Sequence, residues 1–190
     1  MRIISGGEFG VQLGVLHGVK LYNTEFNDSG VSTFGYAAKG WRTDQGTQEK
    51  LLKAYGLWED HPTPGFSRNK SRDIRNIDEA DVVVVVSRNP TNLHLAAAWY
   101  ALHGVYNPDN ALSIDRDFEV VSHALKKVIF VQKLTSETLR TIAARLASEI
   151  GNISNVAFLG DSEERNSGIQ ELTGELIYTT LKIMYGKTER

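Results

Sequence analysis

Residues that could do chemistry gather in three short segments, and the first is Ser5-Gly6-Gly7-Glu8-Phe9. Its two glycines follow a short apolar run and precede a segment with helical spacing. Glycine lets a ligand approach the backbone closely, and the free N–H groups at a helix start attract negative charge. The segment therefore predicts a phosphate-binding turn, with Ser5 as a hydrogen-bonding side chain and the Glu8 and Phe9 amides on the anion. An ordinary strand-to-helix connector is the alternative interpretation.

The second segment, residues 35–46, has side chains suited to binding. It combines three glycines, two cations and two large aromatic residues without a helical or strand period, which is typical of a loop. Lys39 and Arg42, with Gly40 between them, could meet an anionic ligand while an aromatic ring packs on a flat one. A surface loop pinned by its aromatic residues is the alternative.

The third segment follows five consecutive valines at residues 82–86. Ligands of open α/β sheets bind at the C-terminal ends of strands, so Arg88, Asn89 and Thr91 are candidates by position. Thr91 is also a suitable helix cap. Arg72, on a preceding helix with a cationic face, would add charge to the site, although such a face can equally be only solvated.

These segments require a scaffold of alternating strands and helices. Apolar or β-branched runs predict strands over residues 2–4, 31–34, 57–58, 82–86, 128–131 and 156–159. Helical spacing predicts helices that begin near residue 9 and over residues 48–55, 66–77, 93–102, 135–150 and 169–185. The valine run indicates a strand covered on both faces. The alternation predicts an α/β fold with a mostly parallel central sheet.

The length of 190 residues and the 41% hydrophobic content fit a single domain over residues 1–190. Two stretches interrupt the alternation and predict insertions. Residues 19–30 mix apolar and turn residues without a sustained period, which predicts an inserted loop or hairpin. Residues 104–122 are largely polar and contain a clear Asn-Pro-Asp-Asn turn, which predicts a loop or small excursion.

Composition excludes several classes of function. A net charge of -2 gives no global attraction to nucleic acid or to an anionic membrane. The absence of cysteine excludes disulfides and thiolate metal sites, and the five histidines lack metal-ligand spacing, so no metal site is predicted. No apolar run approaches a membrane span, and no signal-peptide core is seen, so we expect a cytoplasmic protein. Homo-oligomers through helix packing stay open.

Four stretches, in order along the chain, resemble the putative molybdenum carrier family. Residues 3–11 are similar to that family's Ile-Ser-Gly-Gly-Gln-Thr-Gly-Val-Asp, and residues 35–46 are similar to its Gly-Trp-Cys-Pro-Lys-Gly-Arg-Arg-Ala-Glu-Asp-Gly. Residues 72–81 and 155–169 resemble two further family segments. The family belongs with the SLOG and lysine-decarboxylase-like Rossmann proteins. The resemblance implies a Rossmann-like three-layer sandwich that binds a nucleotide or a related phosphorylated ligand.

The chain departs from that family at positions that matter for chemistry. Gln12 and His17 stand where the family has aspartates. The family's second Gly-Gly-Thr turn is replaced by Arg88-Asn89-Pro90-Thr91, which has no glycine and lacks one N–H at the proline. Molybdenum is therefore not carried over, and no cofactor is assigned.

Three functions follow from these residues. The first is binding of a nucleotide or nucleotide-derived phosphorylated ligand at the strand C-termini, the small molecule being the expected partner. The second is hydrolysis of the N-glycosidic bond of nucleoside monophosphates, with Glu8 as the catalytic carboxylate and Asp44 or Asp161 as weaker candidates. The third is a non-catalytic interaction protein with a degenerate pocket. His94, on a helix beside the expected cleft, is the histidine closest to this chemistry.

Overall fold

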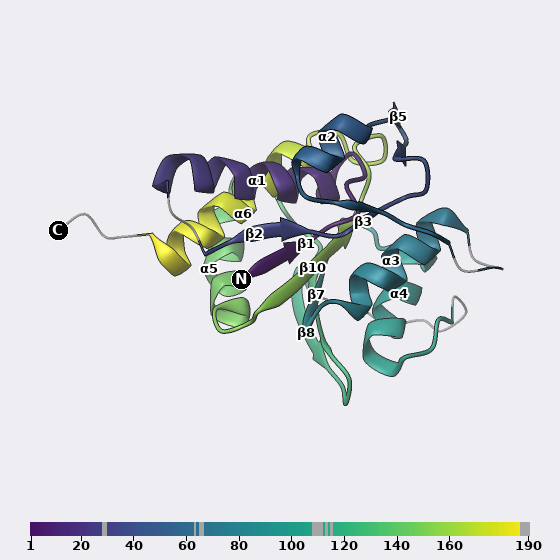
Figure 1. Ribbon diagram of the computed structural model, residues 1–190. Coiled ribbons are helices and arrows are strands. Elements are labelled where there is room, and N and C mark those ends of the chain that lie inside the picture. Colours follow the sequence, from purple (N-terminus) through teal and green to yellow (C-terminus); the bar gives the residue numbers. More distant parts are fainter. Residues whose placement is uncertain are drawn as a thin grey trace.

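A six-stranded sheet forms the centre of the protein (Figure 1). The computed structural model describes residues 1–27, 30–62, 64, 67–107, 112, 114 and 116–186. The strand order is β2-β1-β10-β7-β9-β8. The strands are β1 (Arg2–Ile4), β2 (Ser32–Phe34), β7 (Val82–Val86), β8 (Phe118–Ser122), β9 (Lys127–Val131) and β10 (Asn155–Gly160). The β8–β9 pair is antiparallel and the other pairs are parallel, which confirms the mostly parallel sheet.

Helices cover both faces of this sheet, so the fold is the three-layer α/β sandwich that the resemblance implies. The described helices are α1 (Val11–Phe26), α2 (Glu49–Ala54), α3 (Arg68–Asp78), α4 (Asn92–His103), α5 (Leu139–Ile150) and α6 (Ile169–Tyr185). Helices α1, α5 and α6 lie on one face, and α3 and α4 lie on the other (Figure 1). Among the described helices, none is both long and apolar enough to cross a membrane.

The valine run is the buried strand that its composition predicts. Val82, Val84 and Val86 belong to the core formed with α1, α5 and α6. Val83 and Val85 belong to the core formed with α3 and α4. Because alternate side chains of a strand point to opposite faces, a strand between two helical layers needs apolar residues at every position.

Helix α1 is longer than expected, so the predicted loop or hairpin at residues 19–30 is wrong up to Phe26. Its packing against α6 explains the extra length. A Cβ atom at Gly14 would lie 2.3 Å from the Gln170 carbonyl oxygen, and one at Gly18 would lie 2.4 Å from the Gly174 carbonyl oxygen. These two glycines let α6 approach closely, and the helix continues to Phe26 because its later apolar side chains join the same core.

Residues 35–46 are not a plain loop, because short strands form within them. They contain β3 (Tyr36–Ala37), which pairs with β6 (Trp58–Glu59), and a hairpin of β4 (Arg42–Thr43) with β5 (Gly46–Thr47). A third core holds this region against α1 and α2.

Besides α1, three expected boundaries change by two residues or more. The end of the polar stretch at residues 104–122 is the edge strand β8, while residues 108–111, 113 and 115 lie outside the described residues. Helix α5 starts at Leu139 rather than Thr135, because Thr135 and Thr138 hydrogen-bond one another in a turn. Helix α3 starts at Arg68, and the expected start at residue 66 lies outside the described residues.

Candidate functional site

The carboxyl ends of β1, β10 and β7 lie next to one another and open into a cleft of about 300 Å³. Helix α1 leads from β1 to its neighbour β2 on one side, and the chain later returns to β7 on the other side of β10. Such a change of direction leaves a crevice at the strand ends, where ligands of open α/β sheets bind. We call this space the strand-end cleft. Its lining residues are Glu8, Phe9, Gln12, Asp44, Asn69, Arg72, Asp73, Thr91, Leu93, His94, Ala97, Leu159, Gly160, Asp161, Ser162, Glu164 and Arg165.

The structure brings together only part of the predicted site. Of the predicted ligand-binding residues, those that line the strand-end cleft are Glu8, Phe9, Arg72 and Thr91. Gln12, Asp44, His94 and Asp161, which the sequence also singled out, join them. The predicted residues that do not line it are Ser5, Gly6, Gly7, Lys39, Gly40, Arg42, Arg88 and Asn89. Lys39, Gly40, Arg88 and Asn89 are exposed elsewhere on the surface.

The glycine turn does not form the open phosphate cradle that its sequence predicts. Gly6 and Gly7 are buried. A Cβ atom at Gly6 would lie 2.7 Å from Cδ of Arg72, a residue of helix α3. The Gly7 N–H donates to the Ser5 hydroxyl at 3.3 Å, and the Glu8 N–H donates to the Gln12 side-chain oxygen at 3.2 Å. These amides are therefore occupied by the protein itself.

Side chains and carbonyls also occupy the other helix starts around the cleft. The Val11 N–H at the start of α1 donates to the Asp161 carbonyl oxygen at 3.0 Å. At the start of α6, the Glu163 carboxylate accepts from the N–H groups of Gly168 at 2.5 Å and Gln170 at 2.9 Å. A carboxylate here also complements the positive end of the helix dipole. These N–H groups are therefore already used by the protein and are not open to an anion.

Arg72 is the buried centre of the cleft wall. Its Nη1 lies 2.7 Å from Oε2 of Glu8, and its Nε and Nη2 each lie 2.9 Å from Oδ1 of Asp73. Burial lowers the pKa of Arg72, but the carboxylates of Asp73 and Glu8 raise it above its usual value. The guanidinium therefore stays charged. The expected cationic helix face is not solvated at this position, since Arg72 is only 3% exposed.

Two carboxyl groups meet beside this arginine. Oε1 of Glu8 accepts a hydrogen bond from the Asp44 backbone N–H at 2.7 Å. Burial raises the pKa of the Asp44 carboxyl, and the neighbouring Glu8 charge raises it further. The structure thus places Asp44, a weaker candidate from the sequence, directly beside Glu8.

His94 holds the start of α4 against the end of β10. Its Nδ1 accepts from the Thr91 N–H at 3.3 Å, so its Nε2 carries the proton that it shares with the Gly160 carbonyl oxygen at 3.1 Å. Burial lowers the pKa of His94, and this outweighs the opposite influence of Asp161. The ring is therefore neutral, and both its nitrogens are used in positioning.

Asp161 joins the ends of two central strands at the floor of the cleft. Its carboxylate accepts from the Ser87 hydroxyl at 2.7 Å, the Arg88 N–H at 3.1 Å and the Asn166 amide at 3.4 Å. Three donors and 5% exposure make Asp161 a fixed structural carboxylate. Arg88 therefore takes part through its backbone rather than through the charge that the sequence suggested.

A second hollow of about 450 Å³ adjoins the strand-end cleft. It shares Glu8, Asp44 and Asn69 with the cleft and adds Ala38, Arg42, Thr43 and Ser67. We call it the Arg42 hollow. Arg42 here, and Arg165 in the cleft, are exposed and form no ion pair with any other residue that the structure describes. They are the cations that an incoming anion could reach.

Sequence reasoning missed several lining residues. Asn69 and Asp73 lie on α3 beside the Arg72 that was identified, and Arg165 lies in the polar loop after β10. The position of that loop after a buried strand was the available signal for Arg165. Within the described ranges, no group of three histidine, aspartate or glutamate residues could hold a metal ion.

Comparisons with known proteins identify the fold. No family model matches the chain, and no curated protein matches it. Among solved structures, the chain is similar to a putative molybdenum carrier protein from Syntrophus aciditrophicus, with a TM-score of 0.63 and 16% sequence identity. The match covers 95% of this chain and 94% of the other. It establishes the shared α/β fold, and the neighbour carries the family name that the sequence motifs resemble.

Proposed function

We propose that the strand-end cleft and the Arg42 hollow together bind a nucleotide or a nucleotide-derived phosphorylated ligand, of which a nucleoside monophosphate is the simplest form. The observation that carries this proposal is the continuity of the two spaces at Glu8, Asp44 and Asn69. The Arg42 hollow offers a phosphate a cation that is unpaired among the described residues, and the strand-end cleft offers a nucleoside apolar surface and carboxyl groups.

The Arg42 hollow suits the phosphate. Arg42 has no ion pair with a described residue, and guanidinium groups bind phosphate oxygens in pairs. The Ser67 hydroxyl accepts from the Lys70 N–H, so its own proton is free for a ligand oxygen. The phosphate is thus held by side chains rather than by the glycine turn.

The strand-end cleft suits the nucleoside. Phe9 and Leu93 supply accessible apolar surface for a base, while Ala97 and Leu159 are almost fully buried. The carboxyl groups of Glu8 and Asp44 at the junction are acceptors for sugar hydroxyls. Five carboxylates line the cleft against two arginines, one of which is already paired, so a multiply charged anion fits poorly there. The difference in charge between the two spaces therefore favours the phosphate in the Arg42 hollow and the nucleoside in the strand-end cleft.

Isothermal titration of the protein with nucleoside monophosphates and with the matching nucleosides tests the proposal. We expect at least one monophosphate to bind, and to bind roughly tenfold more tightly than its nucleoside because of the charged contact with Arg42. Absence of binding by every monophosphate, or equal affinity with and without the phosphate, would reject it. Absence of all binding would favour an interaction protein with a degenerate pocket.

Hydrolysis of the N-glycosidic bond is a second candidate, favoured by the Glu8 and Asp44 pair. In such a reaction, one carboxylate stabilises the positive charge that develops on the sugar, and the other group exchanges a proton with the leaving base or the attacking water. Glu8 is fixed by its ion pair with Arg72, which suits the stabilising role. In this proposal Asp44, whose pKa is raised by burial and by the Glu8 charge, exchanges the proton.

Release of free base from nucleoside monophosphates, followed by chromatography, tests this candidate. Asp44→Asn should slow the release by roughly a hundredfold or more while monophosphate binding is retained. If wild-type protein binds a monophosphate without releasing base, the binding function stands and the hydrolase is rejected.

A further inference from the structure

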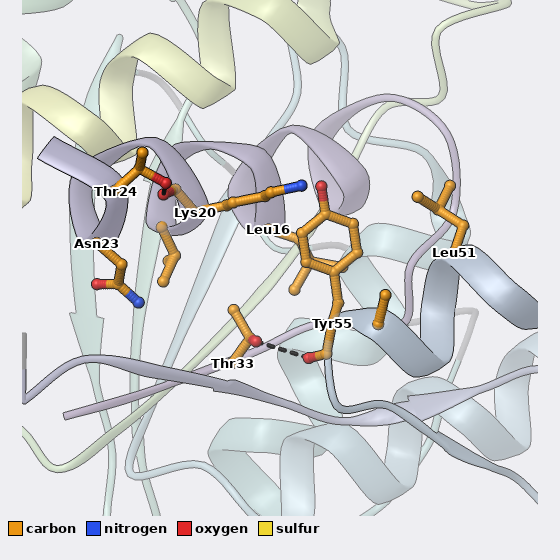
Figure 2. Close-up of a pocket in the computed structure, with 9 residues that line it drawn as sticks. Leu16, Lys20, Asn23, Thr24, Thr33, Leu51 and Tyr55 are labelled. Atoms are coloured by element: carbon orange, nitrogen blue, oxygen red, sulfur yellow. Dashed lines mark hydrogen bonds between the residues drawn. The ribbon is translucent and has the colours of Figure 1, made fainter. Parts of the chain in front are cut away.

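A separate pocket of about 340 Å³ lies between α1, α2 and the edge strand β2, away from the strand ends (Figure 2). Its lining residues are Leu16, Val19, Lys20, Asn23, Thr24, Thr33, Leu51, Ala54 and Tyr55. None of them lines the strand-end cleft or the Arg42 hollow. We call this space the α1–α2 pocket. Its volume is near the lower end of small-molecule sites, so it suits a ligand smaller than a cofactor.

The lining of the α1–α2 pocket is partly apolar and has one charged group. Leu51 and Ala54 supply accessible aliphatic surface, whereas Leu16 and Val19 are almost fully buried. Lys20 is the one charged residue in the lining, which contains no carboxylate. Figure 2 shows the Lys20 side chain reaching toward Tyr55, and its Nζ lies 5.9 Å from the centre of that ring. This charge pattern is the opposite of the carboxylate-rich strand-end cleft.

The acidic residues of the two flanking helices are already paired elsewhere. Glu25, the acid of α1, lies 3.4 Å from Lys182 of α6. Glu49, the acid of α2, lies 2.6 Å from Lys53. Lys20 therefore has no carboxylate partner among the described residues, and its charge is available to a ligand.

Tyr55 adds a neutral hydroxyl group to the lining of the pocket. The Thr33 hydroxyl donates to the Tyr55 carbonyl oxygen at 2.6 Å (Figure 2), which fixes the end of α2 against β2. The Tyr55 hydroxyl carries a proton that can be donated to a ligand oxygen. The nearby His17 ring, 5.7 Å from the Tyr55 ring, has its pKa lowered by burial and by the Lys20 charge, so Lys20 is the cation of this region.

We propose that the α1–α2 pocket binds a small amphipathic monocarboxylate, whose apolar body lies against Leu51 and Ala54 and whose carboxylate pairs with Lys20. This site is independent of the proposed nucleotide site. A medium-chain fatty acid is the simplest ligand of this class, and octanoate is a suitable probe.

Isothermal titration with octanoate, octanamide and octylamine tests the proposal, since the three share a chain and differ in charge. We expect octanoate to bind roughly tenfold more tightly than octanamide, and octylamine to bind most weakly. In amide NMR spectra, octanoate should shift residues 16–24 and 51–55 while residues around Glu8 and Asp161 stay unchanged. Failure of octanoate to bind, or equal binding of octylamine, would overturn the proposal.

Variants of Lys20 identify the charged contact. Lys20→Met should remove the preference for octanoate over octanamide, and Lys20→Arg should retain it. Lys50→Met is the matched control, because Lys50 is an exposed lysine of α2 outside the pocket lining. A loss of preference in Lys50→Met as large as in Lys20→Met, or a full preference in folded Lys20→Met, would overturn the assignment. Circular dichroism of each variant establishes that it is folded.

Discussion

Glu8 and Arg72 are 64 positions apart in sequence, yet Oε2 of Glu8 lies 2.7 Å from Nη1 of Arg72. This pair joins the segment after β1 to α3, and the same arginine covers Gly6. The place where the glycine turn was expected to hold an anion is thus taken up by the ion pair of Arg72 with Glu8. Stability and site geometry therefore depend on the same contact.

Arg72→Met should destabilise the protein by about 3 kcal/mol, because it leaves Glu8 and Asp73 without their shared cation. Urea unfolding measures this change. Combination with Glu8→Gln should cost less than the sum of the two single variants, since the charge that lost its partner is then removed. Arg140→Gln, at an exposed position of α5, is the control and should have little effect. Additive effects of Arg72→Met and Glu8→Gln would contradict a coupled pair.

His94 should make the stability of the protein depend on pH. Burial lowers the folded-state pKa of His94 below its ordinary value of 6.5. The unfolded chain then takes up a proton first as the pH falls, so the free energy of unfolding should decrease below about pH 6.5 and level off once the folded ring is protonated.

His94→Gln should weaken this pH dependence while stability at pH 7.5 is largely kept. Glutamine at the third helical position can also accept from the N–H of Thr91, but it does not titrate. Thermal unfolding between pH 5 and 7.5 measures the difference. His61→Gln, on an exposed part of the chain, should keep the wild-type dependence. An unchanged pH profile in His94→Gln would mean that other groups cause it.

Gly18→Ala should destabilise the protein by about 1–3 kcal/mol through overpacking, although alanine favours helices more than glycine does. The new methyl group would meet the Gly174 carbonyl oxygen at 2.4 Å, and backbone atoms cannot rotate away. Gly30→Ala is the matched control, because a Cβ atom there has no neighbour within 4 Å. Chemical denaturation of both variants gives the comparison, and equal stability would show that α6 can shift.

Arg42→Met should weaken nucleoside monophosphate binding roughly tenfold and leave nucleoside binding unchanged. Lys39→Met should leave both unchanged, because Lys39 lines neither the cleft nor the Arg42 hollow. Both cations lie in the same predicted loop and could not be told apart from sequence, so their comparison tests the geometry directly. A larger effect from Lys39 than from Arg42 would place the phosphate elsewhere.

Most of the fold was predictable because it rests on local patterns. The valine run and the apolar stripe of α5 each indicate the type of element from residues that are close in sequence. The helix over residues 19–26 was not predicted, because the polar residues there interrupt the apolar spacing. This helix is held by its close packing against α6 at Gly14 and Gly18. That contact joins segments far apart in sequence, and a single chain carries no local sign of it.

The site was less predictable, and the glycine turn shows why. Gly6 and Gly7 have the conformational freedom that a phosphate loop needs. Whether such a turn is open depends on which side chains of other elements cover it, here Arg72 from α3 and Leu52 from α2. Glu8 and Thr91 were found because their place after a strand is enough to bring them to the cleft.

Strand β10 lies in the middle of the sheet, yet it is the last of the strands to be synthesised. Until residue 160 has left the ribosome, β1 and β7 have no shared neighbour, and each presents an unpaired hydrogen-bonding edge. We therefore expect the incomplete chain to be prone to pairing with other chains at these two edges. A truncated product that ends at Ile150 would expose the same edges permanently, and we expect it to aggregate rather than to fold.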